Sequence, residues 1–315
     1  MNEWGGGYQL ELKNFHQHIY FKPSYAELYG EVFIFKFQEK DFFFQTIAIK
    51  NPIPNSAFYD ISSPYGYSGI YTNTQNTNFL HKAFEKLSQQ AKKENIIAFF
   101  LRLHPFSPYI DALKNFFHFH TINKEIILVP IALNPEQIRR NYSVKIRNSV
   151  IKAREKLNID FCTLEDLPKF QKLYHETMSR NKADQFYYFD EKYFKSLFKL
   201  PESVFLKASL ENEILAFACF FLYKDISYYH LSANSLKENA NSALLDFFFE
   251  YAHKQDSQIC ILGGGLKDHD SLYNFKKKFS RLKTNFEIAG LVFDEKNYQK
   301  ICQNYANNKF LKYRY

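Results

Sequence analysis

The alternation of apolar and polar residues along the chain predicts a mixture of strands and helices. In residues 78–94, apolar side chains recur at the three- and four-residue spacing of an amphipathic helix. Residues 31–38 and 42–49 are rich in Phe, Ile and Val, and the polar stretch between them predicts a hairpin. Residues 96–103 and 126–131 predict two further strands, which would close the first part of the fold.

The second part of the chain predicts helices first and then a sheet. Pro135 opens a long predicted helix, because proline is favourable in a first helical turn. After Pro201, strands alternate with short polar turns, and Asn241 is the expected cap of a later helix. The predicted order is strand, strand, strand, helix, strand, helix, strand, at residues 204–210, 214–222, 226–231, 242–255, 259–262, 271–279 and 287–293.

One stretch combines a strand end, three glycines and a basic helix. The apolar residues 259–262 lead into glycines at 263–265, and glycines let a backbone approach another group closely. Asp270 or Ser271 can cap the helix that follows. The first turn of that helix would then direct free backbone N–H groups toward an anion or a polarised carbonyl.

The helix predicted from Pro135 carries an excess of positive charge. Between Pro135 and Asn158, seven residues are basic and two are acidic, and arginines at 140, 147 and 154 recur every seven residues. This balance is too one-sided for a salt-bridged surface and favours binding to phosphate groups. A plain solvated face is the alternative.

Composition limits the class of protein. With 315 residues, the chain is long enough for roughly two domains, and its net charge of +8 favours anionic partners. The four cysteines form no Cys-x-x-Cys pair, so neither a zinc site nor a disulfide framework is indicated. No signal peptide is recognisable and no apolar run reaches ~18 residues. We therefore expect a cytoplasmic protein without a transmembrane segment, and leave peripheral contact with a membrane open.

Two segments of the first half carry candidate ligand-binding groups. A loop rich in Ser, Gly and Pro contains Tyr65, Gly66 and Tyr67, and such tyrosines offer flat surfaces and hydroxyl donors to a ligand. A simple turn between strands is the alternative. At the end of a predicted strand, Arg102 and His104 would project to one face. His104 is a candidate general base or a structural hydrogen-bonding residue.

No metal site is predicted. His16 and His18 are two residues apart, but no carboxylate or third histidine that would complete a site lies near them in the sequence. His175 and Glu176 do not continue into the His-Glu-x-x-His pattern of zinc proteases.

Several of these segments together resemble the FemABX-like acyltransferases, a branch of the GNAT superfamily. That branch includes enzymes that add amino acids to peptidoglycan precursors. The similar motifs are Leu-Gly-Gly-Gly at 262–265 with Asp-Ser-Leu-Tyr-Asn-Phe-Lys at 270–276, Ser-Pro-Tyr-Gly-Tyr at 63–67, Arg-Leu-His-Pro at 102–105, and the basic segment at 142–153. The element order after Pro201 is also that of GNAT proteins, and the resemblance covers roughly residues 20–293.

The resemblance implies a mixed α/β fold. Two GNAT-like subdomains, residues 1–132 and 133–315, would pack together with a substrate cleft between them. By its place in the family motif, Lys276 would stabilise the oxyanion. The proton would be accepted by His230 or His104, or carried by the substrate itself. The substrate-binding residues would be Tyr65, Gly66, Tyr67, Arg102, His104, Lys145, Arg147, Asn148, Lys152, Gly264, Asn274 and Phe275.

The family chemistry is acyl transfer onto an amine. The expected acceptor is an anionic cell-envelope precursor, such as a muropeptide or an amino sugar. Residues 235–241 stand where ordinary GNAT enzymes hold CoA, and they contain no glycine. We therefore expect aminoacyl-tRNA rather than acyl-CoA as donor, no tightly bound cofactor and no binding to DNA. An acyl-CoA-dependent N-acetyltransferase of a surface polysaccharide sugar and a non-catalytic RNA- or glycan-binding protein are the alternatives.

Overall fold

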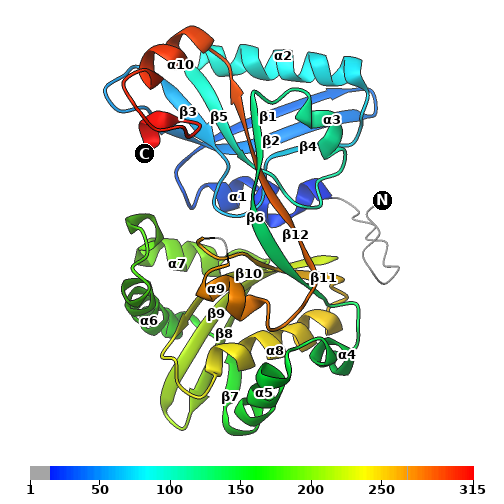
Figure 1. The fold of residues 1–315 in the computed structure, drawn as a ribbon, viewed down its shortest axis with the longest axis vertical. Coiled ribbons are helices and arrows are strands. Elements are labelled where there is room, and N and C mark those ends of the chain that lie inside the picture. The colour runs from blue at the N-terminus through cyan, green and yellow to red at the C-terminus, as the bar shows by residue number, and fades with distance from the viewer. Residues whose placement is uncertain (1–14, 268) are drawn as a thin grey trace. The chain divides into compact units, whose positions relative to one another are not determined.

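The computed structural model describes residues 15–267 and 269–315 (Figure 1), which form two compact units. Unit 1 comprises Glu125–Thr284, and unit 2 comprises residues 15–124 together with Asn285–Tyr315. The division predicted at residue 133 placed the C-terminal segment in the second subdomain. In the structure this segment groups with the N-terminal residues, because its strand pairs with a strand of that unit.

Unit 2 is built on the hairpin that the apolar residues near the N-terminus predict. The strand order is β1-β2-β3-β5-β12, with β4 paired to β2. β3 and β5 are parallel, whereas the β1–β2, β2–β3 and β5–β12 pairs are antiparallel. The strands are β1 (Glu31–Glu39), β2 (Phe42–Pro52), β3 (Tyr59–Ser62), β4 (Ile70–Thr72), β5 (Ile96–Arg102) and β12 (Lys283–Val292).

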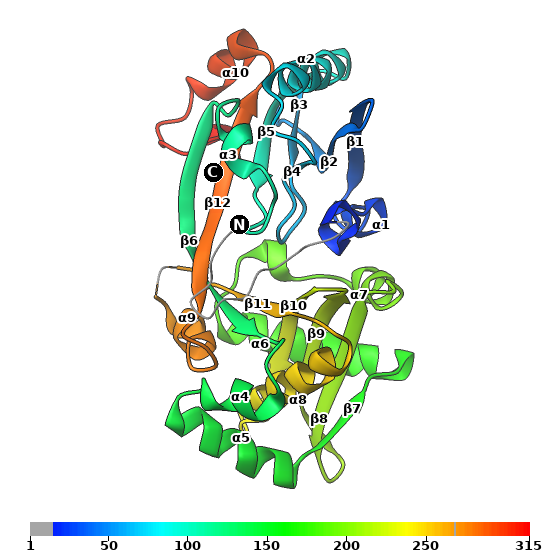
Figure 2. The same ribbon diagram turned by 90° about the vertical axis from the view of Figure 1, so that its right-hand side faces the viewer.

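Helices cover both faces of β5 in unit 2 (Figure 2). Phe99 and Leu101 of β5 belong to one core with the apolar stripe of α2, and Ala98 belongs to another with Cys302 of α10. This division follows from the alternation of side chains along a strand. The helices of this unit are α1 (Pro23–Ala26), α2 (Thr77–Lys93), α3 (Ile110–Lys114) and α10 (Glu295–Cys302).

The strands of unit 1 are also mixed in direction and lie in the order β6-β11-β10-β9-β8-β7. β10 and β11 are parallel, and the other neighbours are antiparallel. The strands are β6 (Phe119–Pro130), β7 (Asn158–Phe161), β8 (Ser203–Leu210), β9 (Glu213–Tyr223), β10 (Ile226–Asn234) and β11 (Ile259–Gly263). β6 and β12 each begin in one unit and end in the other.

The two faces of the sheet in unit 1 are covered by different helices (Figure 1). Along β9, Phe220 stacks on Phe248 of α8, whereas Phe217 stacks on Phe170 of α6. We call these the α8 face and the α6 face. The α8 face is covered by α4 (Pro135–Arg140), α5 (Val144–Lys156), α8 (Ala240–Lys254) and α9 (Ser271–Lys276), and the α6 face by α6 (Leu167–Arg180) and α7 (Glu191–Phe198).

The strand-and-helix order predicted after Pro201 is confirmed. Two predicted helices, one before and one after Pro201, differ from the structure at their ends. The single helix predicted from Pro135 is two helices, α4 and α5, and the backbone N–H of Ser143 between them donates to the Lys278 carbonyl at 2.8 Å. The expected cap Asn241 lies inside α8, whose N-cap is Asn239 in the left-handed conformation.

Within the part of the chain that the structure describes, no helix combines the length and apolar character needed to cross a membrane.

Candidate functional site

The sheet of unit 1 divides where β10 and β11 separate. The two parallel strands pair at three positions, from Ile226 with Ile259 to Tyr228 with Ile261. Beyond that point, β10 continues against β9 as far as Asn234, and Gly263 of β11 pairs with β6. We call the region beyond the last shared pair the fork. A fork of this kind brings backbone and side chains of two strands close to one another without closing the ladder between them.

Lys276 joins the two arms of the fork. Its side chain is buried, and Nζ donates a hydrogen bond to the carbonyl of Gly264, just after β11, at 2.7 Å. The same Nζ lies 5.7 Å from the ring centroid of Tyr229, the first β10 residue beyond the shared pairs. A cation held in this way is already positioned toward any negative charge that develops at the fork.

Tyr229 anchors the β10 arm, and sequence reasoning missed it as a candidate site residue. Its hydroxyl donates to Ser232 Oγ at 2.5 Å and accepts from Asn241 Nδ2 at 3.2 Å. Burial raises the pKa of Tyr229, so the phenol is protonated at neutral pH. The only sequence signal was its position in a Tyr-Tyr-His strand, which does not specify the face on which each side chain lies.

His230 does not share the site of Lys276. Its Nε2 lies 3.2 Å from the hydroxyl of Tyr193 on α7, and its ring packs against Phe221. These contacts place His230 on the α6 face, whereas Tyr229 and Lys276 lie on the α8 face. Burial lowers the pKa of His230 to about 3. The structure therefore does not bring the two predicted catalytic side chains together.

The Asp270 carboxylate, directly before α9, is bound by backbone N–H groups of the chain on both sides of it. The Asp270 carboxylate accepts from the backbone N–H of Tyr273 at 2.8 Å, of Leu266 at 2.7 Å and of Lys267 at 3.0 Å. The predicted Asp270 cap is confirmed, and it occupies the Tyr273 N–H, so this N–H of the first helical turn is not free to face a ligand. Burial acts to raise the pKa of Asp270, but these hydrogen bonds hold it below its ordinary value.

The glycine motif has a steric reason at Gly265. A Cβ at this position would lie 2.0 Å from Asp270 Oδ1. The close approach expected of the glycines is therefore an approach to the capping carboxylate. Two predicted binding residues lie near it: Asn274 donates to the His269 carbonyl at 2.7 Å, and the Phe275 ring packs against Phe279.

In unit 2, the predicted tyrosine loop belongs to an aromatic cluster. The Tyr67 ring contacts Tyr20 at 5.8 Å, Phe286 at 5.2 Å and His104 at 6.1 Å between centroids. The Tyr65 carbonyl accepts a hydrogen bond from the Tyr25 hydroxyl at 2.5 Å. The structure thus brings Tyr67 and His104 together.

Gly66 and the end of β5 hold this loop in place. Gly66 has φ of +113°, and a Cβ there would lie 2.1 Å from the Tyr20 ring. Ser63 Oγ accepts from the backbone N–H of Arg102 at 3.0 Å. His104 Nδ1 accepts from the Phe106 N–H at 3.1 Å, and burial, together with His18, keeps the pKa of His104 well below its ordinary value. His104 is therefore a neutral, enclosed side chain.

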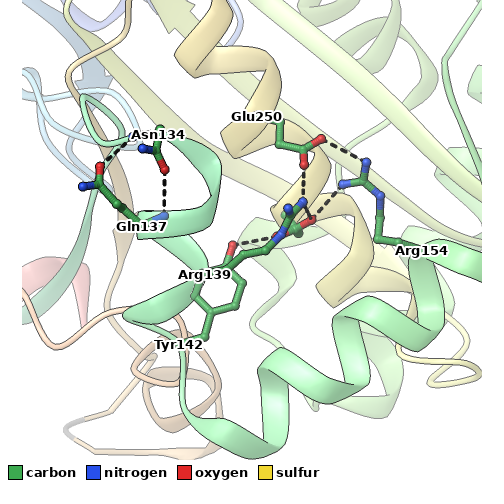
Figure 3. Close-up of polar contacts among 7 residues, drawn as sticks. Asn134, Gln137, Arg139, Tyr142, Arg154 and Glu250 are labelled. Carbon is green, nitrogen blue, oxygen red and sulfur yellow. Dashed lines mark hydrogen bonds and ion pairs between the residues drawn. The ribbon is translucent and has the colours of Figure 1, made fainter.

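The basic segment of α4 and α5 divides into inward and outward groups. Arg139 and Arg154 turn inward and converge on Asp246 and Glu250 of α8 (Figure 3). Arg139 Nε lies 2.9 Å and Arg154 Nη1 lies 2.8 Å from Asp246, which also accepts from the Tyr142 hydroxyl. The expectation of an unpaired basic helix is wrong for these two arginines, because their partners lie about a hundred residues further along the chain.

The outward group contains four residues predicted to bind substrate. Lys145, Asn148 and Lys152 are exposed on α5, and Arg147 is half-buried at its flank. No ion pair joins any of the three cations to a carboxylate among the described residues. In the described parts of the chain there is also no group of three or more His, Cys, Asp or Glu side chains suited to a metal.

Comparison with solved structures finds proteins of similar architecture. The crystal structure of FemX matches with a TM-score of 0.70 at 15% identity, over 89% of this chain and 93% of FemX. The chain has the FemX fold. L-PGS from Bacillus licheniformis is also similar, with a TM-score of 0.55 at 15% identity, over 84% of this chain and 85% of that chain. The tandem GNAT-like, mixed α/β fold predicted from the sequence is therefore confirmed.

Comparisons of sequence alone find no relative of this chain. No protein-family model matches the chain, and neither does any curated protein. The relationship to FemX is therefore one of fold.

Proposed function

We propose that this protein is an acyltransferase that moves an aminoacyl group onto an amine of a cell-envelope precursor. The observation that carries the proposal is the buried Lys276 ammonium at the fork, hydrogen-bonded to Gly264 and facing Tyr229. The FemX fold supports it, because the FemABX-like proteins that the sequence resembles transfer amino acids to peptidoglycan precursors.

In this reaction the amine of the acceptor attacks the ester carbonyl of the donor. The carbonyl oxygen becomes an oxyanion, and Lys276 would stabilise that charge more strongly than it stabilises the neutral ester. The carbon–oxygen bond to the leaving ribose then breaks, and the proton lost by the amine ends on the departing oxygen. No histidine is needed for this transfer, which fits the placement of His230 on the α6 face.

The loop before α8 supports aminoacyl-tRNA as the donor. A GNAT enzyme that uses CoA offers backbone N–H groups of this loop to the pyrophosphate. Here the N–H of Leu236 donates to Asn234 Oδ1 at 3.2 Å, and the N–H of Ala240 donates to the Lys237 carbonyl at 3.1 Å. Glu238 adds a carboxylate at the same place, paired with Lys156 at 3.2 Å. Pyrophosphate would have to displace these contacts.

A label-transfer assay tests the proposal. Purified protein is incubated with tRNA carrying radiolabelled amino acids, or with radiolabelled acetyl-CoA, together with a UDP-linked muropeptide. We expect label to move from the tRNA, and Lys276→Met to lower the rate by about 10²–10³-fold because one oxyanion-stabilising group is lost. Lys277→Met, at the exposed neighbouring position, is the matched control and should keep the wild-type rate.

The acceptor affinity of the Lys276→Met variant separates enzyme from binding protein. An enzyme in which Lys276 acts on the transition state keeps its affinity for the muropeptide while its rate falls. Equal loss of binding and transfer, or no transfer by the wild-type protein, would favour the non-catalytic alternative. Transfer from acetyl-CoA alone would overturn the choice of donor.

A further inference from the structure

The outer face of α5 combines exposed apolar and basic side chains. Val144 and Ile151 are 64% and 47% exposed, and their seven-residue spacing places them in one row along the helix. Lys145 and Lys152 have the same spacing and form the adjacent row, with Asn148 between the two rows. The exposed Glu155 is the only acidic residue of this helix. The opposite side of α5 is buried against the α8 face.

This face continues onto the turn after α9. The Ser143 N–H, directly before Val144, donates to the Lys278 carbonyl at 2.8 Å, so the two segments are in contact. Lys277, Lys278 and Arg281 are exposed on that turn. We define the α5 patch as Val144, Lys145, Asn148, Ile151, Lys152, Lys277, Lys278 and Arg281.

The cations of the α5 patch differ from the two arginines beneath them. Arg139 and Arg154 are neutralised by Asp246 and Glu250. The lysines and the arginine of the patch make no ion pair with a carboxylate in the described residues, so their charge is directed to solvent. A surface that keeps five unneutralised cations beside two exposed aliphatic side chains has the composition of a helix that lies in a lipid interface.

We propose that the α5 patch docks the protein on a membrane surface rich in anionic lipids. The lysines and the arginine would face phosphodiester headgroups, and Val144 and Ile151 would enter the boundary between headgroups and acyl chains. A nucleic acid backbone would also attract the cations, but it offers no apolar layer for the two aliphatic side chains. The proposal does not depend on the proposed enzymatic activity.

Vesicle co-sedimentation of the full chain tests the proposal. The probes are phosphatidylcholine vesicles with and without about one-third phosphatidylglycerol, at physiological ionic strength. We expect the wild-type protein to bind only the anionic vesicles. Lys145→Gln/Lys152→Gln should weaken binding roughly 30-fold, because each lysine near such a surface contributes about a fivefold change in affinity.

The apolar row gives the decisive variant. Val144→Ser/Ile151→Ser should weaken vesicle binding about tenfold, and this loss should persist at high salt because it comes from apolar burial. Lys92→Gln/Lys93→Gln, on the exposed end of α2, is the matched control for removing two charges and should bind as the wild type does. All substituted side chains are exposed, so the thermal midpoint should stay unchanged in every variant.

Three results would overturn the proposal. The first is full vesicle binding by the Val144→Ser/Ile151→Ser variant. The second is equal binding of the wild type to neutral and anionic vesicles. The third is tRNA binding that is lost in the Lys145→Gln/Lys152→Gln variant while vesicle binding stays at the wild-type level, which would make the α5 patch an RNA-binding surface.

Discussion

The two faces of the sheet in unit 1 differ in the basic side chain that each one buries: Lys276 on the α8 face and His230 on the α6 face. On the α8 face, three cations are held by oxygen atoms of the chain: Lys276 by Gly264, and Arg139 and Arg154 by Asp246. On the α6 face, His230 packs among aromatic rings, and burial lowers its pKa to about 3. The α8 face therefore holds a buried cation at an oxygen acceptor, together with two partly exposed arginines, whereas the buried basic group of the α6 face stays neutral.

This difference shows what each of the two side chains can contribute to chemistry. A cation that is already bound to chain oxygens costs little to hold in place when negative charge develops beside it. A neutral imidazole among aromatic rings packs well but supplies no charge. The comparison explains why the proposed mechanism uses Lys276 and leaves His230 with a structural role.

The largest expected effect comes from removing the carboxylate at the centre of the α8 face. Asp246→Ala leaves Arg139, Arg154 and Tyr142 without their shared acceptor. We expect a loss of about 3 kcal/mol in the free energy of unfolding, at the low end for a broken buried pair because both arginines are partly exposed. Urea denaturation at neutral pH measures this loss.

An exposed ion pair provides the control for that prediction. Glu213 pairs with Lys237 in solvent, and Glu213→Gln should change the free energy of unfolding by no more than about 0.5 kcal/mol. Equal effects of the two substitutions would mean that the Asp246 network does not stabilise the α8 face.

The second largest loss of stability is expected at Gly265, which follows the Gly264 carbonyl that Lys276 binds. Gly265→Ala places a methyl group where the Asp270 carboxylate lies, so the carboxylate must move away from the N–H groups it accepts from. We expect a loss of about 2 kcal/mol from crowding and broken hydrogen bonds, measured as a fall in the denaturation midpoint.

A double variant distinguishes this cause from a general effect of alanine. In the Asp270→Ala background the methyl group no longer meets a carboxylate, so Gly265→Ala should cost much less there. Additive losses would show that the close approach of Gly265 and Asp270 is not the source of the strain.

The third effect appears on the α6 face as a dependence of stability on pH, and it is the smallest of the three at neutral pH. The folded pKa of His230, about 3, lies below its ordinary value, so between these values the unfolded chain binds a proton that the folded chain does not. Stability is therefore expected to fall as pH decreases below about 6.5, by up to about 1.4 kcal/mol per pH unit from this group. At higher pH, His230 should cause no further change in the free energy of unfolding.

His230→Gln should remove that contribution. Urea denaturation across mildly acidic pH should give a shallower decline than in the wild type, while His104, also buried with a lowered pKa, keeps its own contribution in both proteins. Identical slopes in the two proteins would contradict burial as the cause of the shift.

Local patterns in the sequence were enough for much of the fold. The apolar stripe of α2, the β1–β2 hairpin and the Asp270 cap depend on neighbours within a few residues, and all three appear as predicted. Prediction was less successful at element ends, as the break between α4 and α5 shows. That break is stabilised by the Lys278 carbonyl, more than a hundred residues away.

For the candidate site, the sequence determined the residue types and the fold resemblance, and the tertiary structure determined which residues meet. The Phe-Lys motif and the basic segment could be recognised in the sequence, because charge and helical spacing are local properties. Asp246 and Glu250 became partners of the basic segment only through the packing of α8 on α5. Tyr229 and His230 are neighbours in the chain, yet they lie on opposite faces because side chains alternate along a strand and each face packs against different helices.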